Sequence, residues 1–550
     1  MDEMEISEQE YSARVPKLAT AAVIVMAATL LSRIFGLVRE QVMAAYFGAH
    51  VQIDAYRVAF ILPNLFRMLL ADAAIGSAFI PVFTSYLARG DRKGAWEVCS
   101  SVINLMVLIL CLFLGLGMIF APQLISILAP GFTNKPQTFK LALIMTRILF
   151  PSVLFMALAG VVMGILNSYE HFTAPALSPV LWNFIIIACI VFLAPKMGVV
   201  SLALGIVVGS LFQFLMQIPF TSGRGARYSL IFNWHHPGVR EVGALLVPVV
   251  ISLASVDINT IVDTRFASRL ITGSVASLGY AIRLWQLPLG LFAIAISTVL
   301  FPTFSRQAAR NDIQGLKNSL SIGIRTLCLI ILPASVGLMT LGIPIIRLLF
   351  ERGRFTPTAT LLTASALFYY AVGLFAAGEL HLVNRAFYSL KDTFTPMVVA
   401  GLSIIVNYFG DWFFMIYLPI FAKLIDLPSS LSWLGYAHGG IALSTSLVCL
   451  FNLVVLMEIL RRRLGGMGGK KIAISFAKIS FASIILGVVA FYGWRVTVLY
   501  VGVSLLGQIL SLGVGILLGV IIYIGVAILL KIEELHFAYQ LMVTRLKGRP

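Results

Sequence analysis

The sequence predicts an all-α membrane protein with fourteen transmembrane helices. Two parallel six-helix repeats come first, and two extra C-terminal helices follow them. Three observations predict this fold. Hydrophobic residues make up 59% of the 550 residues and charged residues only 11%, too few to coat several water-facing domains. Apolar runs recur at the length of a bilayer span. A shift of 221 residues, which places Phe79 on Leu300, aligns similar motifs.

Fourteen runs have the roughly 20 apolar residues that a helix needs to cross a bilayer. They lie near residues 17–47, 53–87, 95–127, 140–168, 174–195, 197–220, 241–270, 274–308, 316–350, 357–389, 394–420, 436–461, 472–495 and 501–531. The loops between them are too short to form water-soluble domains.

The runs divide the chain into seven predicted parts. These are a cytoplasmic N-terminus (1–16), an N-terminal six-helix lobe (17–220), a cytoplasmic linker (221–240), a C-terminal six-helix lobe (241–461), a basic glycine-rich linker (462–471), transmembrane helices 13 and 14 (472–531) and a cytoplasmic tail (532–550).

The repeat is clearest between Phe79–Gly94 and Leu300–Gly315, which share proline, phenylalanine, alanine, arginine, aspartate and glycine at aligned positions. Six spans form each repeat, so both repeats enter the membrane in the same direction. We therefore expect a pseudo-twofold axis along the membrane normal. Lobes related in this way usually enclose a substrate path and rock against each other.

The net charge of +17 comes from 40 Lys and Arg against 23 Asp and Glu. In a membrane protein this excess belongs to the cytoplasmic loops, so it indicates topology and no nucleic-acid partner. With both termini in the cytoplasm, the inner loops hold most of these residues, including Arg89, Arg92, Lys93, Arg306, Arg310, Lys317, Arg461, Arg462, Arg463, Lys470 and Lys471. We predict an N-in, C-in topology.

Four of the arginines inside predicted spans are candidates for a functional role, because a charge there costs at least about 2.5–3.5 kcal/mol. Arg33 and Arg39 lie on span 1, Arg67 on span 2 and Arg283 on span 8. Arginine presents paired donors that match phosphate oxygens. A cluster of these four in a wet cavity would select an anionic, phosphorylated substrate. Structural pairing or snorkelling is the alternative, and we favour it for Arg57, Arg147 and Arg325.

A second group of polar residues falls on spans 7, 11 and 12: Asp263, Asn407, Asp411, Ile441 and Thr445. The two four-residue spacings within it place Asn407 with Asp411, and Thr445 with the Ile441 carbonyl, on shared helix faces. Such oxygens could bind Na⁺ or protons, and interhelical hydrogen bonding remains the alternative. No nucleotide-binding loop, nucleophile motif or histidine metal spacing is recognisable, so we expect no enzyme and no organic cofactor.

Several motifs resemble the MurJ/MviN family of lipid II flippases, within the MOP exporter superfamily. They are LSRIFGLVRE (31–40), DAYRVAFILPNLFR (54–67), FIPVF (79–83), APGF (129–132) and RGRFT (352–356). The resemblance implies alternating-access transport of lipid II, the undecaprenyl-diphosphate-linked peptidoglycan precursor, across the bacterial inner membrane. It further implies a monomer, contacts with membrane lipids and other cell-wall synthesis proteins, and a groove for the undecaprenyl tail at spans 13 and 14.

The resemblance also implies roles for particular residues. The substrate cavity would contain Ser32, Arg33, Arg39, Asp54, Asn64, Arg67 and Arg283, and a Na⁺ site would contain Asp263, Asn407, Asp411, Ile441 and Thr445.

The chain departs from the family pattern at three places. Glu40 stands where aspartate is frequent, residues 73–81 read AAIGSAFIP, and Gln286 stands where some members have glutamate. Four alternatives stay open: another MOP-type flippase for lipid-linked oligosaccharides, an ion-coupled exporter, a membrane glycan polymerase and a silent scaffold.

Overall fold

The computed structural model describes residues 8–68, 78–222 and 228–535, which form helices and no β-strand. The all-α membrane fold is confirmed. Eleven helices in this part are long and apolar enough to cross a membrane. The other three predicted spans, 17–47, 53–87 and 241–270, carry intramembrane charges or include residues outside the described part. The count of fourteen and the boundaries of the seven parts therefore stay predictions.

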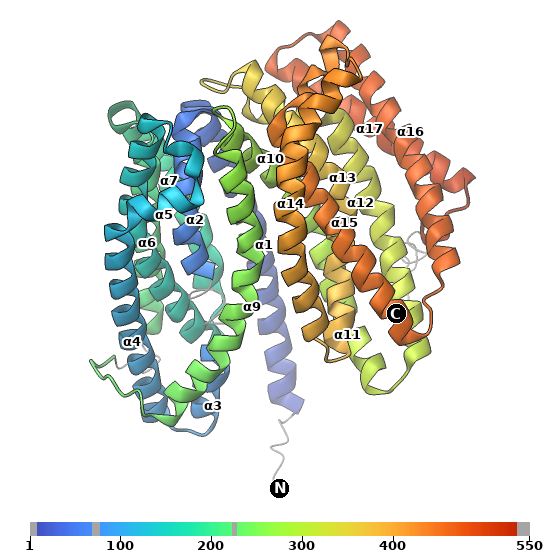
Figure 1. Cartoon of the computed structure of the whole chain (residues 1–550). Coiled ribbons are helices and arrows are strands. Elements are labelled where there is room, and N and C mark those ends of the chain that lie inside the picture. The colour runs from blue at the N-terminus through green and yellow to red at the C-terminus, as the bar shows by residue number, and fades with distance from the viewer. Residues whose placement is uncertain (1–7, 69–77, 223–227, 536–550) are drawn as a thin grey trace. The chain divides into compact units, whose positions relative to one another are not determined.

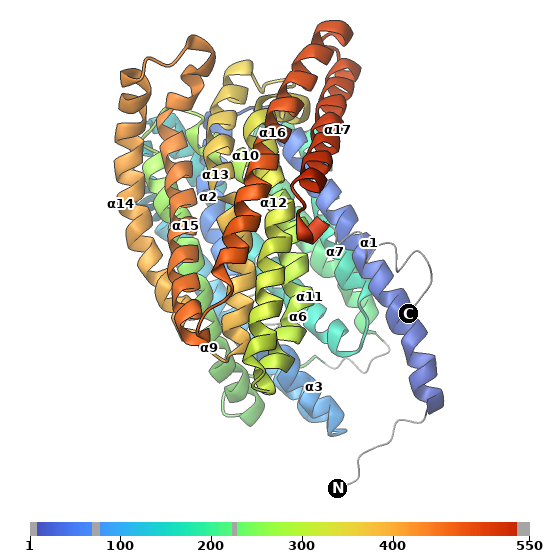
Figure 2. The same ribbon diagram turned by 90° about the vertical axis from the view of Figure 1, so that its right-hand side faces the viewer.

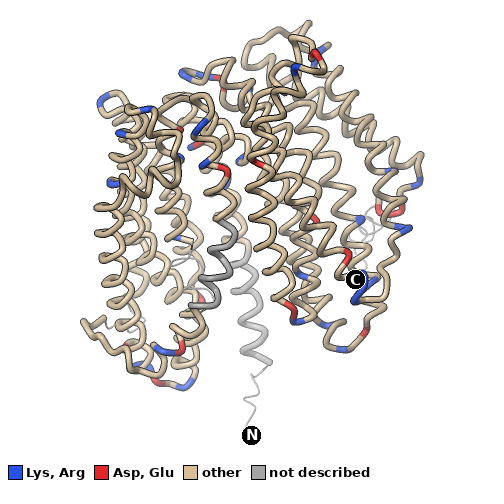
Figure 3. Tube along the Cα trace, in the orientation of Figure 1, with Lys and Arg blue, Asp and Glu red and all other residues tan. Residues whose placement is uncertain are grey.

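The chain forms two compact units, unit 1 (residues 1–261) and unit 2 (residues 262–550). In both units most charged residues lie near helix ends and few lie along the helix middles (Figure 3). This distribution is the one expected when lipid surrounds the helix middles.

Unit 1 is built around one central helix, α6 (Pro136–Ser168). Against α6 pack α2 (Val51–Phe66), α3 (Ile80–Ala88), α4 (Arg92–Ile119), α5 (Ala121–Leu128) and α8 (Val200–Gln217) (Figure 1). Helix α7 (Thr173–Met197) packs against both α8 and α1 (Glu8–Phe47). Short 3₁₀ turns follow α5 and α8, as η3 (Pro130–Phe132) and η4 (Ile218–Thr221), and α9 (Pro237–Ala267) begins in this unit.

Unit 2 is built around α13 (Pro357–Ser389). The helices packed on α13 include α10 (Ser274–Pro288), α11 (Ile294–Ala309), α12 (Ile313–Phe350) and α15 (Ala437–Leu464). Helix α14 (Phe394–Leu424) packs mainly on α15, and η6 (Ser429–Gly435) connects these two. Beyond the repeat, α16 (Gly469–Val501) and α17 (Leu505–Leu529) lie side by side and contact α12 (Figures 1 and 2).

The two central helices are the same element of the repeat. Helices α6 and α13 both have 33 residues, and the 221-residue shift places Pro136 on Pro357. Proline suits the first position of a helix because its missing N–H would have no partner there. Both helices end in the same turn, in which Glu170 and Lys391 adopt positive φ angles of 57° and 59°.

Helices α4 and α12, which precede α6 and α13 in the two repeats, also begin alike. Asp91 caps α4 by accepting a hydrogen bond from the Gly94 amide at 2.8 Å, and Asp312 caps α12 through the Gly315 amide at 2.8 Å. A carboxylate at this position satisfies an amide that has no partner within the helix. The aligned Asp and Gly of the sequence repeat therefore encode one local structure twice.

Predicted span 8 contains a break in its α-helical geometry. Helix α10 ends at Pro288, a π-helical segment η5 (Leu289–Ala293) follows, and α11 continues the span. Proline lacks the amide hydrogen that the helix would use. Predicted span 2 changes similarly: Pro63 lies inside α2, and residues 67–68 are π-helical. Such turns often mark functional positions, and here they follow Arg283 and include Arg67.

Candidate substrate and cation sites

Arg39 belongs to a cluster of charges in unit 1 whose centre is Glu40. One carboxylate oxygen of Glu40 is 3.0 Å from Nη2 of Arg39, and the other is 2.7 Å from Nη2 of Arg57. Glu40 is buried, with 3% of its surface exposed. This arrangement agrees with a structural pairing for Arg57. It also leaves the three side chains with one net positive charge.

Arg39 stacks on an aromatic ring. Its guanidinium carbon is 5.0 Å from the centre of the Trp182 ring on α7, and Trp182 donates a hydrogen bond to Ser210 Oγ on α8 at 3.2 Å. A cation over an indole face is attracted to it. The stack and the Glu40 carboxylate together hold the guanidinium in one orientation.

The predicted substrate-cavity residues of span 2 lie on or next to α2. Arg67 donates a hydrogen bond to the Asn64 side-chain oxygen at 3.2 Å, so the structure joins these two predicted residues. Asp54 is buried near the start of the same helix. On α1, Ser32 is half-buried and Arg33 is exposed.

Arg283 is exposed on α10 in unit 2, and its Nη1 is 3.4 Å from Oε1 of Gln286. Gln286 thus supplies a neutral oxygen where some family members have a carboxylate. Because Arg283 belongs to the other unit, the convergence of all four arginines stays a prediction.

The predicted cation site falls within unit 2, where the structure brings together its polar residues. Asn407 Nδ2 on α14 donates to Asp263 Oδ1 on α9 at 2.7 Å. Thr445 Oγ1 on α15 is 3.4 Å from Asp263 Oδ2 and 3.2 Å from the Ile441 carbonyl oxygen. The one hydroxyl proton of Thr445 can serve only one of these acceptors at a time.

Asp411 is the unusual member of this group. It is fully buried (0% exposed), and neither of its carboxylate oxygens forms a hydrogen bond of good geometry with the described residues. Ser444 and Asp263 lie near it, and the charges of the two acids interact. Buried carboxylates need a counter-charge or a proton. The oxygens of Asp263, Asp411, Thr445 and Ile441 suit a monovalent cation or a proton.

Small residues let α14 and α15 approach closely enough to form the site. A Cβ atom on Gly440 of α15 would collide with the backbone carbonyl of Phe414 on α14, and one on Gly410 of α14 would collide with Ser444 of α15. Small residues commonly allow such close contact of membrane helices.

This contact gives a stability prediction. Gly440→Ala should destabilise the purified protein by about 1–3 kcal/mol, because the new methyl group meets backbone that cannot rotate away. Thermal unfolding measures the loss. Gly401→Ala, on α14 in open space, is the matched control and should not lower the melting temperature. Equal melting temperatures for both variants would contradict the close contact.

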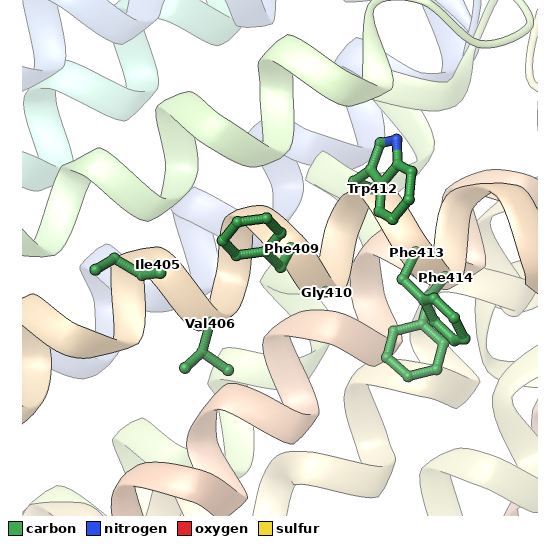
Figure 4. Close-up of a pocket in the computed structure, with 7 residues that line it drawn as sticks. All are labelled: Ile405, Val406, Phe409, Gly410, Trp412, Phe413 and Phe414. Atoms are coloured by element: carbon green, nitrogen blue, oxygen red, sulfur yellow. The ribbon is translucent and has the colours of Figure 1, made fainter.

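Helix α14 also carries an apolar surface. Ile405, Val406, Phe409, Gly410, Trp412, Phe413 and Phe414 line a pocket on this helix (Figure 4). Phe409 and Trp412 are exposed, whereas Asn407 and Asp411 are buried. The pocket has no charged group to bind phosphate, so it is not a candidate head-group site.

Several residues of these sites carry no recognisable signal in the sequence. Trp182 and Ser210 support Arg39, and Ser444 donates to the Asn407 backbone oxygen at 3.2 Å. Tyr370 of α13 is buried beside the cation site, close to Thr445. Nothing in their local sequence distinguishes these residues from ordinary packing residues of a membrane helix.

Comparison with known proteins identifies the family. The family described as lipid II flippase MurJ matches residues 43–511. A probable lipid II flippase MurJ from Rickettsia prowazekii is 32% identical over 510 residues, which cover 91% of this chain and 97% of that protein.

The chain belongs to the lipid II flippase MurJ family. A solved structure of a lipid II flippase MurJ in an inward closed conformation has a TM-score of 0.73 and 29% identity, covering 91% of this chain and 98% of that one. An inward-facing multidrug-resistance MATE transporter of the MOP superfamily shares the fold, with a TM-score of 0.62 and 14% identity over 81% of this chain and 98% of its own. Members of the family are transporters, and this chain is a multi-pass inner-membrane protein and no enzyme.

Proposed function

We propose that this protein moves lipid II from the inner to the outer leaflet of the cytoplasmic membrane by alternating access. The observation that carries the proposal is the match to the probable lipid II flippase MurJ from Rickettsia prowazekii over almost the whole length of both chains. The charges on α1, α2 and α10 supply the chemistry that a diphosphate requires.

Arginine side chains are the proposed ligands of the diphosphate. Trp182 and Glu40 hold the Arg39 guanidinium in one orientation. Asn64 accepts a hydrogen bond from Arg67 and orients it in the same way. Holding a guanidinium in place before the ligand arrives reduces the entropy lost on binding. Arg33, Arg283, Ser32 and Asp54 are the other proposed cavity residues.

The hydrophobic tail has a separate proposed place. Helices α16 and α17 expose many large apolar residues, including Ile484, Val488, Leu517 and Ile521. An undecaprenyl chain could remain in contact with this apolar surface and with lipid while the charged head group crosses, so its transfer from lipid would cost little.

Coupling to a cation is proposed for the site of Asp263, Asn407, Asp411, Ile441 and Thr445. Na⁺ would relieve the repulsion between the two acids, and a proton on one of them is the alternative. The contacts of Asp263 with Asn407 and Thr445 support the proposal because they bring polar side chains of α9, α14 and α15 together.

The proposed topology places both termini in the cytoplasm and can be tested by cysteine labelling. In a cysteine-free background, cysteines replacing Lys93 and Lys470 should be shielded from an impermeant thiol reagent added to intact cells, and cysteines replacing Asn134 and Ser430 should react. All four positions are exposed, so burial does not confound the result. The reverse pattern would contradict N-in, C-in.

The proposed transport itself can be tested in cells by depletion. Loss of the protein should make lipid II accumulate on the inner face of the membrane, because synthesis continues while export stops. Re-expression of the wild-type protein should restore export. An unchanged distribution of lipid II across the membrane after depletion would contradict the proposal.

A further inference from the structure

A buried carboxyl group lies in the central helix of unit 2, away from the cation site. Glu379 of α13 is only 2% exposed. Its Oε1 is 3.8 Å from the Cys328 thiol sulfur on α12, and its Oε2 has no hydrogen-bond partner among the described residues. A thiol is a weak donor, so Glu379 has little that could stabilise a negative charge.

The cations around this position are engaged elsewhere. Arg325, one turn before Cys328 on α12, lies 3.1 Å from Glu533 and 2.6 Å from Glu534, which follow α17. On α13 itself, the guanidinium of Arg385 lies over the ring of Phe301, 5.1 Å from its centre.

The other ionisable side chains on α13 and on the elements packed against it form no described hydrogen bond or ion pair with Glu379. They are Tyr280 and Arg283 on α10, Arg306 on α11, Lys317 and Arg347 on α12, Tyr369, Tyr370, His381 and Tyr388 on α13, Tyr408, Asp411, Tyr417 and Lys423 on α14, and His438, Cys449, Glu458, Arg461, Arg462 and Arg463 on α15.

The internal repeat shows that the fold does not require this carboxyl. The 221-residue shift places Glu379 on Leu158 of α6 and Cys328 on Val107 of α4. Helices α4 and α6 pack together in unit 1 as α12 and α13 do in unit 2. Unit 1 therefore has an apolar pair where unit 2 has an acid and a thiol. A packing role alone does not explain an acid in this place.

We propose that Glu379 is a reversible proton-binding site of this protein, distinct from the pair Asp263 and Asp411. An isolated carboxylate costs several kcal/mol in apolar surroundings, so the group carries a proton while α12 and α13 are packed as described. On binding, hydronium transfers a proton to a carboxylate oxygen, which forms the O–H bond and leaves a water molecule. When a conformational change admits water between α12 and α13, the O–H bond breaks and the proton returns to water as hydronium.

This site would link proton binding to the conformation of unit 2, because the packed arrangement binds the proton more tightly than an open one. A ligand that prefers one conformation shifts the population toward it. The inference does not depend on lipid II as the substrate.

Infrared spectroscopy of the purified, membrane-reconstituted full chain tests proton binding directly. The wild-type protein at neutral pH should show a C=O stretching band of a protonated carboxylic acid that shifts in D₂O and is lost in Glu379→Gln. Asp411 is unchanged in both proteins, so the difference spectrum isolates Glu379. Identical carboxylic-acid bands in the two proteins would overturn the proposal.

Transport in proteoliposomes tests whether the proton is released during the cycle. With an imposed pH gradient, lipid II transport by the wild type should respond to the direction of the gradient, and Glu379→Gln should lose that response. Glu379→Leu provides a second variant. It should fold, because leucine (Leu158) stands at the equivalent position of unit 1. A full response retained in either folded variant would overturn the release step. Failure of the wild type to transport lipid II would instead contradict the proposed function, while the infrared result would stand.

Discussion

Arg39→Ala, Arg67→Ala and Arg283→Ala should each reduce lipid II transport by at least about tenfold while the protein still inserts in the membrane. A hydrogen bond to a charged group contributes roughly 1.5–3 kcal/mol, and each 1.4 kcal/mol is a factor of ten. Transport by the purified variants in proteoliposomes measures the loss. The effect of Arg39→Ala should be large, because the remaining charges of Glu40 and Arg57 then cancel and no guanidinium lies over Trp182.

Lysine replacements separate geometry from charge. Arg39→Lys and Arg67→Lys should restore only part of the rate, because an ammonium group keeps the charge but lacks the paired donors of a guanidinium. Arg462→Ala is the matched control, since Arg462 is exposed at the end of α15 and pairs only with Glu458 in the described structure. Normal transport in any two of the three alanine variants would contradict the assignment of these arginines to the cavity.

Na⁺ should raise the melting temperature of the purified protein more than K⁺ or choline at equal ionic strength. A ligand that binds only the folded state stabilises it by RT ln(1 + [L]/Kd), about 2.7 kcal/mol at a hundred times Kd. Asp263→Asn or Asp411→Asn should remove the Na⁺-specific increase, because each removes a negative charge from the site. Thermal unfolding in a series of NaCl, KCl and choline chloride measures the difference.

Arg283→Ala is the control for this experiment and should keep the Na⁺-specific increase, since Arg283 lies on α10, outside the proposed Na⁺ site, and donates a hydrogen bond to Gln286. A wild-type protein whose melting temperature does not distinguish Na⁺ from K⁺ would contradict the Na⁺ site. Coupling would then come from protons or from the membrane potential acting on the charged substrate.

The fold was predictable because helix-length apolar runs and the repeat are properties of the chain itself. The predicted ranges 357–389 and 316–350 lie within a few residues of α13 and α12. The π-helical segment Leu289–Ala293 was not predicted, since its apolar sequence fits an α-helix equally well. Pro288 was the available signal, but proline alone does not specify which irregular geometry follows it.

The sites were predictable only in part. Spacing placed Asn407 with Asp411 on one helix face, and it could not show that Asp263 would meet them from α9. Contacts between helices far apart in sequence depend on packing, here on Gly410 and Gly440. Trp182 and Tyr370 were missed for the same reason, because an aromatic residue in a membrane span is usually a packing or lipid-facing residue.

The most direct test of the proposed flippase activity is lipid II translocation by the purified protein alone in proteoliposomes. The accessibility of labelled lipid II to an impermeant reagent measures it. We expect the wild type to move lipid II between leaflets, and Arg39→Ala reconstituted at the same density to remain near the rate of protein-free liposomes. Equal rates for wild type, Arg39→Ala and empty liposomes would contradict the proposal that this chain is itself the flippase.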